Sequence, residues 1–339
     1  MPLKSILRSK KRQTQVLATL IVCIFFTIGG TLLSKQEEET GLNQRLAAIE
    51  EPSALVIPEK PASVSLEKFT RKSTTNGKIA WEITGSTVNV YNEDDLAEIQ
   101  MPILTLHREE PTPVVITAKS ALVNFIGQEI KQADLNEDVV LKNTNYQVET
   151  NHAEFYQSKN LLIAPGNVKI FSEQLDVTGE DLTSHTSSEI NIIKKNTKST
   201  IRKQASSNKK KSAALQVIKV SSDRLDFNNK SSKFKYSGNV IAKDGTHQID
   251  ADILSGRFTE TQELTDFVAN GNVIITDKEG LETKSDRADF DLKTNDVVLS
   301  GNPELMQNNN LVKAEIIYYN TATGKSHAEG EVEVTLLEK

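Results

Sequence analysis

Apolar and polar residues alternate along most of the chain after about residue 65. Between residues 266 and 276 one parity is apolar or small, and it consists of Phe267, Ala269, Gly271, Val273 and Ile275. An alternation of period two predicts a β-strand with one buried face. Similar runs recur toward the C-terminus, separated by turn signals such as Asp244-Gly245. The pattern therefore predicts an all-β fold after the N-terminal region.

One segment departs from this pattern. Residues 16–33 form an uncharged, mostly apolar run that is near the lower length limit for a helix that spans a bilayer. Basic residues precede it and acidic residues follow it, which places the N-terminus in the cytoplasm by the positive-inside rule. We expect a cytoplasmic basic segment at 1–15 and a transmembrane anchor at 16–33. A cleaved signal peptide is the alternative, but no small-x-small site follows the run.

Two polar stretches divide the remainder of the chain. Residues 34–64 contain Pro52, Pro58 and Pro61 and predict an extended spacer. Residues 184–214 are rich in Ser, Thr, Asn and Lys and predict a basic, solvated linker between two domains, at 65–183 and 215–339. An alternative role for this linker is contact with anionic phosphates of a lipid headgroup or membrane.

An internal repeat is the most informative feature of the sequence. Gly238-Asn239-Val240 recurs as Gly271-Asn272-Val273, as Gly301-Asn302-Pro303 and as Gly330-Glu331-Val332, at glycine spacings of 33, 30 and 29 residues. A second motif, Ser222-Asp223-Arg224-Leu225-Asp226-Phe227, returns at residues 285–290 with one change. Units of this length cannot bury an apolar face alone, so they stack and share a core. We expect each glycine to mark a bend where a side chain would not fit.

Composition narrows the possible functions. The net charge of −6 argues against a nucleic-acid partner. The chain has a single cysteine, Cys23, and its five histidines show no ligand spacing, so no metal site and no cofactor are predicted. Asp250 with Asp252, and Asp289 with Asp291, have the spacing of paired carboxylates on one strand face, which leaves a polysaccharide-active enzyme as a minor alternative.

The two halves resemble two families of lipopolysaccharide-transport proteins. Residues 215–339 resemble LptA/OstA-like proteins, through the two Ser-Asp-Arg-x-Asp-Phe copies and through residues 267–273 and 328–332. Residues 65–183 resemble LptC, and the residues that carry the resemblance are 116–121, 139–141, 146–155 and 175–179. The resemblance implies tandem open β-jellyroll domains behind one N-terminal transmembrane helix. Because these domains are usually separate proteins, whether this chain replaces both stays open.

In these families the jellyroll interior is a long apolar groove that holds lipid. We expect it to be lined in the first domain by Trp81, Ile83, Val88, Ile116, Val139, Leu141, Val148 and Phe155. In the second domain we expect Phe234, Tyr236, Val240, Ile249, Phe267, Val273, Ile275, Phe290, Val297 and Leu299. Alternation alone is more typical of a filled sandwich core, and only the resemblance favours a lipid groove, so a structural or adhesive β-repeat envelope protein is the main alternative.

The resemblance also implies a mechanism without catalysis. The chain is expected to be a single-pass inner-membrane protein with its bulk in the periplasm. It would receive lipopolysaccharide, by the lipid A acyl chains, from the periplasmic domains of an ABC transporter. Edge strands, including the terminal strand 330–337, would pair with the outer-membrane translocon or with further bridge-protein copies.

Overall fold

The protein is described by a computed structural model that covers residues 55–75, 77–107, 113–126, 129–142, 146–172, 175–185, 188, 190–202, 217–228, 231–259, 264–307 and 309–336. Nearly all of these residues lie in strands, with two single 3-10 turns, η1 Asn92–Asp94 and η2 Gln157–Lys159, so the predicted all-β fold is confirmed. The predicted anchor at 16–33 lies outside the described residues. Among the residues that are described, none of the helical segments is long and apolar enough to cross a bilayer.

The described chain divides into two compact units. The N-terminal unit contains residues from 55–143 and 151–162, and the C-terminal unit contains residues from 144–150 and 163–336. Two strands, β8 Tyr146–Tyr156 and β9 Leu161–Ser172, contribute residues to both units. The units therefore change over well before the segment 184–214 that the sequence suggested as a linker.

The N-terminal unit is built from two layers of antiparallel strands. Its elements are β1 Val64–Thr75, β2 Lys78–Tyr91, β3 Leu96–Gln100, β4 Ile103–Leu106, β5 Val114–Thr117, β6 Ser120–Ile126, β7 Glu129–Lys142 and part of β8 Tyr146–Tyr156. The long strand β2 pairs with β3 through residues 87–91 and with β4 through residues 81–84. Likewise β7 pairs with β6 through one half and with β5 through the other. Long strands thus run through both layers, while short strands belong to one.

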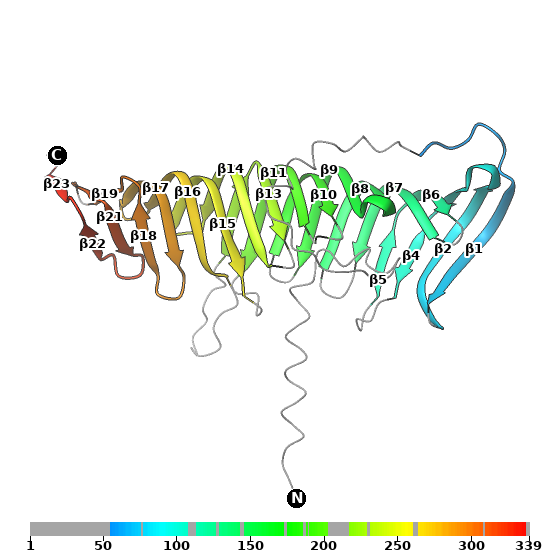
Figure 1. Ribbon diagram of the computed structural model, residues 1–339, viewed down its shortest axis with the longest axis horizontal. Coiled ribbons are helices and arrows are strands. Elements are labelled where there is room, and N and C mark those ends of the chain that lie inside the picture. Colours follow the sequence, from blue (N-terminus) through cyan, green and yellow to red (C-terminus); the bar gives the residue numbers. More distant parts are fainter. Residues whose placement is uncertain are drawn as a thin grey trace, which may run out of the picture. The chain divides into compact units, whose positions relative to one another are not determined.

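The C-terminal unit repeats this plan over more strands. Its elements are part of β9 Leu161–Ser172, then β10 Leu175–His185, β11 Ile190–Arg202, β12 Val217–Ser222, β13 Arg224–Asn228, β14 Lys233–Lys243, β15 His247–Phe258, β16 Leu264–Asp277, β17 Glu282–Asp291, β18 Asp296–Ser300, β19 Glu304–Gln307, β20 Asn310–Lys313, β21 Ile316–Asn320, β22 Ser326–Glu329 and β23 Glu333–Leu336. Successive antiparallel hairpins join β14 to β15, β15 to β16 and β16 to β17, and these strands follow one another in Figure 1.

Two layers can be followed through this unit from the pairing alone. The first layer contains β13, β18, β21 and β22, with the adjoining halves of the long strands. The second layer contains β12, β19, β20 and β23, with the other halves. Inward side chains alternate as the sequence predicted: Phe267, Ala269, Val273 and Ile275 are all buried.

The repeated Gly-Asn pairs are the corners at which strands pass from one layer to the other. In β16 the register with β17 shifts between Asn270 and Val273, and Gly271 and Asn272 both have positive φ angles, of 76° and 48°. A Cβ atom on Gly271 would collide with the carboxylate of Asp252, which accepts a hydrogen bond from the Asn272 amide at 2.9 Å. The same arrangement joins Gly238 and Asn239 to Asp223. The expectation that no side chain fits at these glycines is confirmed.

The predicted linker at 184–214 is wrong for residues 190–202, which form β11. This strand pairs with β10 on one side and with β12 and β13 on the other. Ile192, Ile193 and Ile201 are buried, and the lysines face outward. The polar composition misled the prediction because inward positions of β11 also carry polar residues, among them Asn191, Thr197 and Ser199.

Candidate functional site

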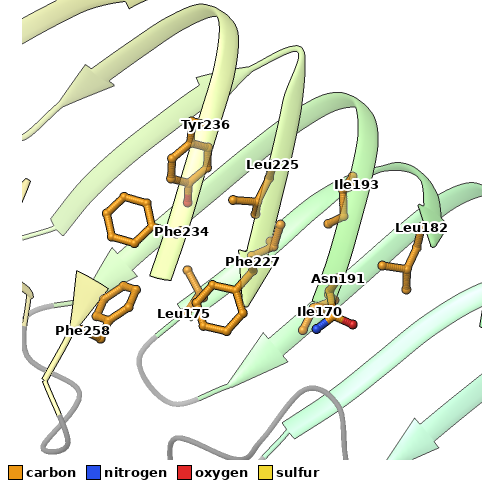
Figure 2. Close-up of a pocket in the computed structure, with 11 residues that line it drawn as sticks. Ile170, Leu175, Leu182, Asn191, Ile193, Leu225, Phe227, Phe234, Tyr236 and Phe258 are labelled. Carbon is orange, nitrogen blue, oxygen red and sulfur yellow. The ribbon is translucent and has the colours of Figure 1, made fainter. Parts of the chain in front are cut away.

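The C-terminal unit contains an apolar pocket between its two layers. Eleven residues line it, and Figure 2 shows their side chains converging from several strands. They are Ile170, Leu175, Val177, Leu182, Asn191, Ile193, Leu225, Phe227, Phe234, Tyr236 and Phe258. The pocket contains about 450 Å³ of space not filled by atoms, including the part that is open to solvent. Its lining is almost wholly apolar, which is typical of sites that bind apolar ligands.

This pocket lies where β11 meets β12 and β13, a junction that we call the seam. Across the seam Ile193 pairs with Leu225 and Asn191 with Phe227, so these side chains share one face. Phe227 in turn pairs with Phe234 on β14. Strand pairing from β10 to β14 thus positions most of the seam pocket, and Phe258 is the last residue of β15.

Aromatic rings form one wall of the seam pocket. Phe258 lies with its ring centroid 5.3 Å from that of Phe234 and 6.5 Å from that of Phe227. Phe234 also makes an edge-to-face contact with Tyr236 at 5.7 Å. Phe227 and Phe258 are half-buried, so part of each residue remains accessible to solvent. Such rings offer large apolar contact area at little entropic cost.

Two polar groups face this apolar interior. The Tyr236 hydroxyl donates a hydrogen bond of 2.9 Å to Ser199 Oγ, which links the first layer to the second. Burial raises the pKa of the Tyr236 hydroxyl to about 12. The other group is the Asn191 side chain, which is 5% exposed and whose Nδ2 has no hydrogen-bond partner among the described residues. Buried amides without partners are uncommon and need an explanation.

The structure places nearly all of the predicted groove residues in the interior. Of the eighteen, all except Val148 are buried, and Val148 is half-buried. Only Phe234 and Tyr236 line the seam pocket. Of the other pocket residues, Asn191 and Ile193 lie in the supposed linker, whereas Leu225 and Phe227 share a parity that was visible in the repeated motif.

The N-terminal unit has its own apolar interior with one cation in it. Trp81, Ile83 and Phe155 belong to its buried cluster, against which Phe125 packs. Arg71 on β1 pairs with Ile83 on β2, so its side chain points to the same inner face. Its guanidinium carbon lies 4.5 Å from the ring centroid of Phe125 and 5.9 Å from that of Trp81, which is cation–π geometry. Sequence alternation predicted the apolar residues here but not this cation.

The carboxylates that suggested an enzyme take part in local bonds. Asp250 accepts a hydrogen bond from Gln248, Asp252 from the corner residue Asn272, and Asp289 from Arg287. In the described part of the chain, no group of three or more acidic, histidine or cysteine side chains is arranged to hold a metal ion. These carboxylates therefore contribute to turns and strand surfaces in this structure.

Comparison with known proteins divides the chain at the seam. Residues 20–215 match the family model described as lipopolysaccharide-assembly, LptC-related. Residues 219–325 match the model described as LptA/(LptD N-terminal domain) LPS transport protein. The change between the two matches, at residues 216–218, falls at the start of β12, which pairs with β11. A comparison with curated proteins found no match.

One solved structure that aligns with the chain is the crystal structure of LptH from Pseudomonas aeruginosa. It is described as the LptA-homologous periplasmic component of the conserved lipopolysaccharide transport device. The two share 16% sequence identity with a TM-score of 0.34, and the alignment covers 36% of this chain and 96% of that chain.

Proposed function

Because the chain belongs to the LptC-related family of lipopolysaccharide-assembly proteins, we propose that it is a periplasmic transport protein that passes lipopolysaccharide along the apolar interior between its two layers. The observation that carries the proposal is the seam pocket. It is an apolar site, and it lies where the LptC-related match gives way to the LptA-related match. The function needs no chemical step by the chain itself.

The physical reason for such a site is the cost of exposing acyl chains to water. A chain of about twelve methylenes costs on the order of 10 kcal/mol in water, at roughly 0.8 kcal/mol for each methylene. A lipid that crosses an aqueous compartment therefore needs apolar cover over its whole path. Strand pairing across the seam supports one continuous and mostly apolar wall from β10 to β14, so that cargo would not cross a separate protein–protein joint at this point.

The remaining parts of the proposal concern its partners. We propose that residues 16–33 anchor the chain in the inner membrane and that β1 docks on a related periplasmic domain of the ABC transporter that supplies the lipid. At the other end, β22 and β23 would pair with the outer-membrane translocon or with another bridge protein. Strand addition to sheet edges supplies main-chain hydrogen bonds for such contacts.

Photocrosslinking in cells tests the proposed cargo. A photoreactive residue at Phe258 would lie in the seam pocket, whereas one at the adjacent Arg257 would lie on the exposed face of the same strand. We expect a lipopolysaccharide adduct at position 258 and none at position 257. Absence of an adduct at 258 and at the buried position Phe267, in protein that is folded and expressed, would favour a structural envelope protein with a filled core.

A further inference from the structure

The seam pocket contains a feature that acyl-chain burial does not explain. Its lining is apolar except for Asn191 and for the hydroxyl of Tyr236, which is already bonded to Ser199. Asn191 Nδ2 is buried, lines the pocket and has no hydrogen-bond partner in the described structure. Leaving a buried amide group unpaired costs about 1–3 kcal/mol. An apolar side chain at this position would avoid that cost.

The position of Asn191 on β11 shows which way its side chain points. Asn191 pairs with Phe227 and is two residues from Ile193, whose side chain also lines the pocket. Asn191 is therefore on the inner face of β11, directly beside Phe227 and in the same pocket lining as Phe258, and both of these aromatic residues are half-buried. A chain that entered past these rings would bring the groups along its length to the Asn191 amide.

We propose that Asn191 is a specificity-determining residue of the seam pocket, which donates a hydrogen bond to a hydroxyl or carbonyl oxygen carried by an acyl chain. This inference rests on the proposed function and adds to it a class of ligand: hydroxylated or acyloxy-substituted chains in preference to plain ones. A plain hydrocarbon would fill the pocket but would leave the amide unpaired. A site built to bond an oxygen rejects the analogue that lacks it, because its own polar group is then left unsatisfied.

The test compares two ligands that differ by one hydroxyl group. The full-length chain in detergent is loaded with a fluorescent fatty-acid probe, which is displaced by 3-hydroxytetradecanoate, by tetradecanoate or by lipopolysaccharide. We expect the wild-type chain to prefer the hydroxylated acid about tenfold, which corresponds to about 1.4 kcal/mol. Asn191→Leu should lose this preference by binding the hydroxylated acid more weakly while it binds tetradecanoate at least as well.

Lys198→Leu is the matched control, because Lys198 is exposed on the opposite face of the same strand. It should keep the wild-type preference. A second measurement separates a ligand-binding role from a structural one. If Asn191 serves the ligand, Asn191→Leu should unfold at the same or a higher denaturant concentration than the wild type in the absence of lipid. A marked loss of stability in Asn191→Leu would show a structural role and overturn the inference.

The outcomes also separate this inference from the proposed function. If lipopolysaccharide displaces the probe but the wild-type chain shows no preference for the hydroxylated acid, or if Asn191→Leu keeps that preference, then the role of Asn191 is wrong and lipid transport stands. If neither the acids nor lipopolysaccharide displaces the probe, the proposed function itself fails.

Discussion

At the scale of single residues, the corner glycines limit what substitutions the fold accepts. Gly271 combines a positive φ angle with a Cβ position that is occupied by the Asp252 carboxylate. Gly245 also has a positive φ angle, of 92°, but nothing lies within 4 Å of its Cβ position. Alanine at either site therefore meets backbone strain, and only at Gly271 does it also meet a steric collision.

We expect Gly271→Ala to lower the free energy of unfolding by more than Gly245→Ala, with about 1 kcal/mol of backbone strain common to both. Chemical denaturation of the two variants measures the difference. The double variant Gly271→Ala with Asp252→Ala removes the carboxylate group, which makes the closest of these contacts, and should recover part of the loss. Equal destabilisation by the two single variants would show that the corner is not sterically constrained.

The Tyr236 hydroxyl provides a pH-dependent contribution to stability. Its pKa is raised to about 12 in the folded protein because burial disfavours the phenolate. Because the folded-state pKa lies above the unfolded-state value of roughly 10, the contribution to stability is fully present below pH 10. It is lost as the pH rises through the folded-state pKa. The amount at stake is on the order of 2–3 kcal/mol.

Tyr236→Phe removes this titration together with the bond to Ser199. Below pH 9 we expect a constant loss of about 1 kcal/mol relative to the wild type, from the missing hydrogen bond. Between pH 10 and 12 the gap should close or reverse, because only the wild type has a tyrosine at this position that ionises when the chain unfolds and must keep its proton when the chain is folded. Denaturation at a series of pH values measures the gap, and a gap that stays constant up to pH 12 would contradict the assigned cause.

At the scale of elements, strand parity and the corner repeat could be predicted from the sequence, whereas β11 could not. Phe267 and Val273 followed from alternation because their inner face is uniformly apolar. β11 carries Asn191, Thr197 and Ser199 inward among its isoleucines and lysines outward, so polar residues occur on both of its faces. Hydropathy cannot distinguish such a strand from a solvated linker. The pocket residues Asn191 and Ile193 were missed for the same reason, because they lie on this strand.

Because β11 is a paired strand, its backbone amides should be protected from hydrogen exchange with solvent. Amide hydrogens in residues 190–202 should exchange as slowly as those of the central strand β14, because β11 is paired on both sides. A linker would exchange within seconds. Ile193→Pro removes a ladder donor from the middle of the sheet, and we expect it to raise exchange in β10 and β13 as well. Mass spectrometry of exchanged peptides measures both effects, and rapid exchange of 190–202 in the wild type would contradict the strand assignment.

At the scale of the whole molecule, both terminal edges leave interior rows of side chains uncovered. In the N-terminal unit, Leu66 pairs with Val88, which pairs with Ile99, and their exposures are 47%, 1% and 0%. In the C-terminal unit, Val334 pairs with Val312 on the face of the buried Leu305, yet Val334 is 59% exposed. The exposure comes from the absence of a further strand among the described residues. Unpaired apolar edges of this kind ordinarily promote association.

These edges predict that association through β23 depends on the inner face of that strand. Val334→Asp places a charge on the apolar row, where a docked partner would bury it, and burial of an unpaired charge is costly. We expect end-to-end association of the full chain, measured by sedimentation in detergent, to weaken at least tenfold, or about 1.4 kcal/mol.

Thr335→Asp is the matched control, because it adds the same charge to the opposite face of β23 and should leave association within twofold of the wild type. If both variants weaken association equally, the effect is one of net charge, and if neither does, β23 is not the docking edge. A selective loss in Val334→Asp would mean that the apolar interior continues from one molecule into the next, which is what a lipid path between membranes requires.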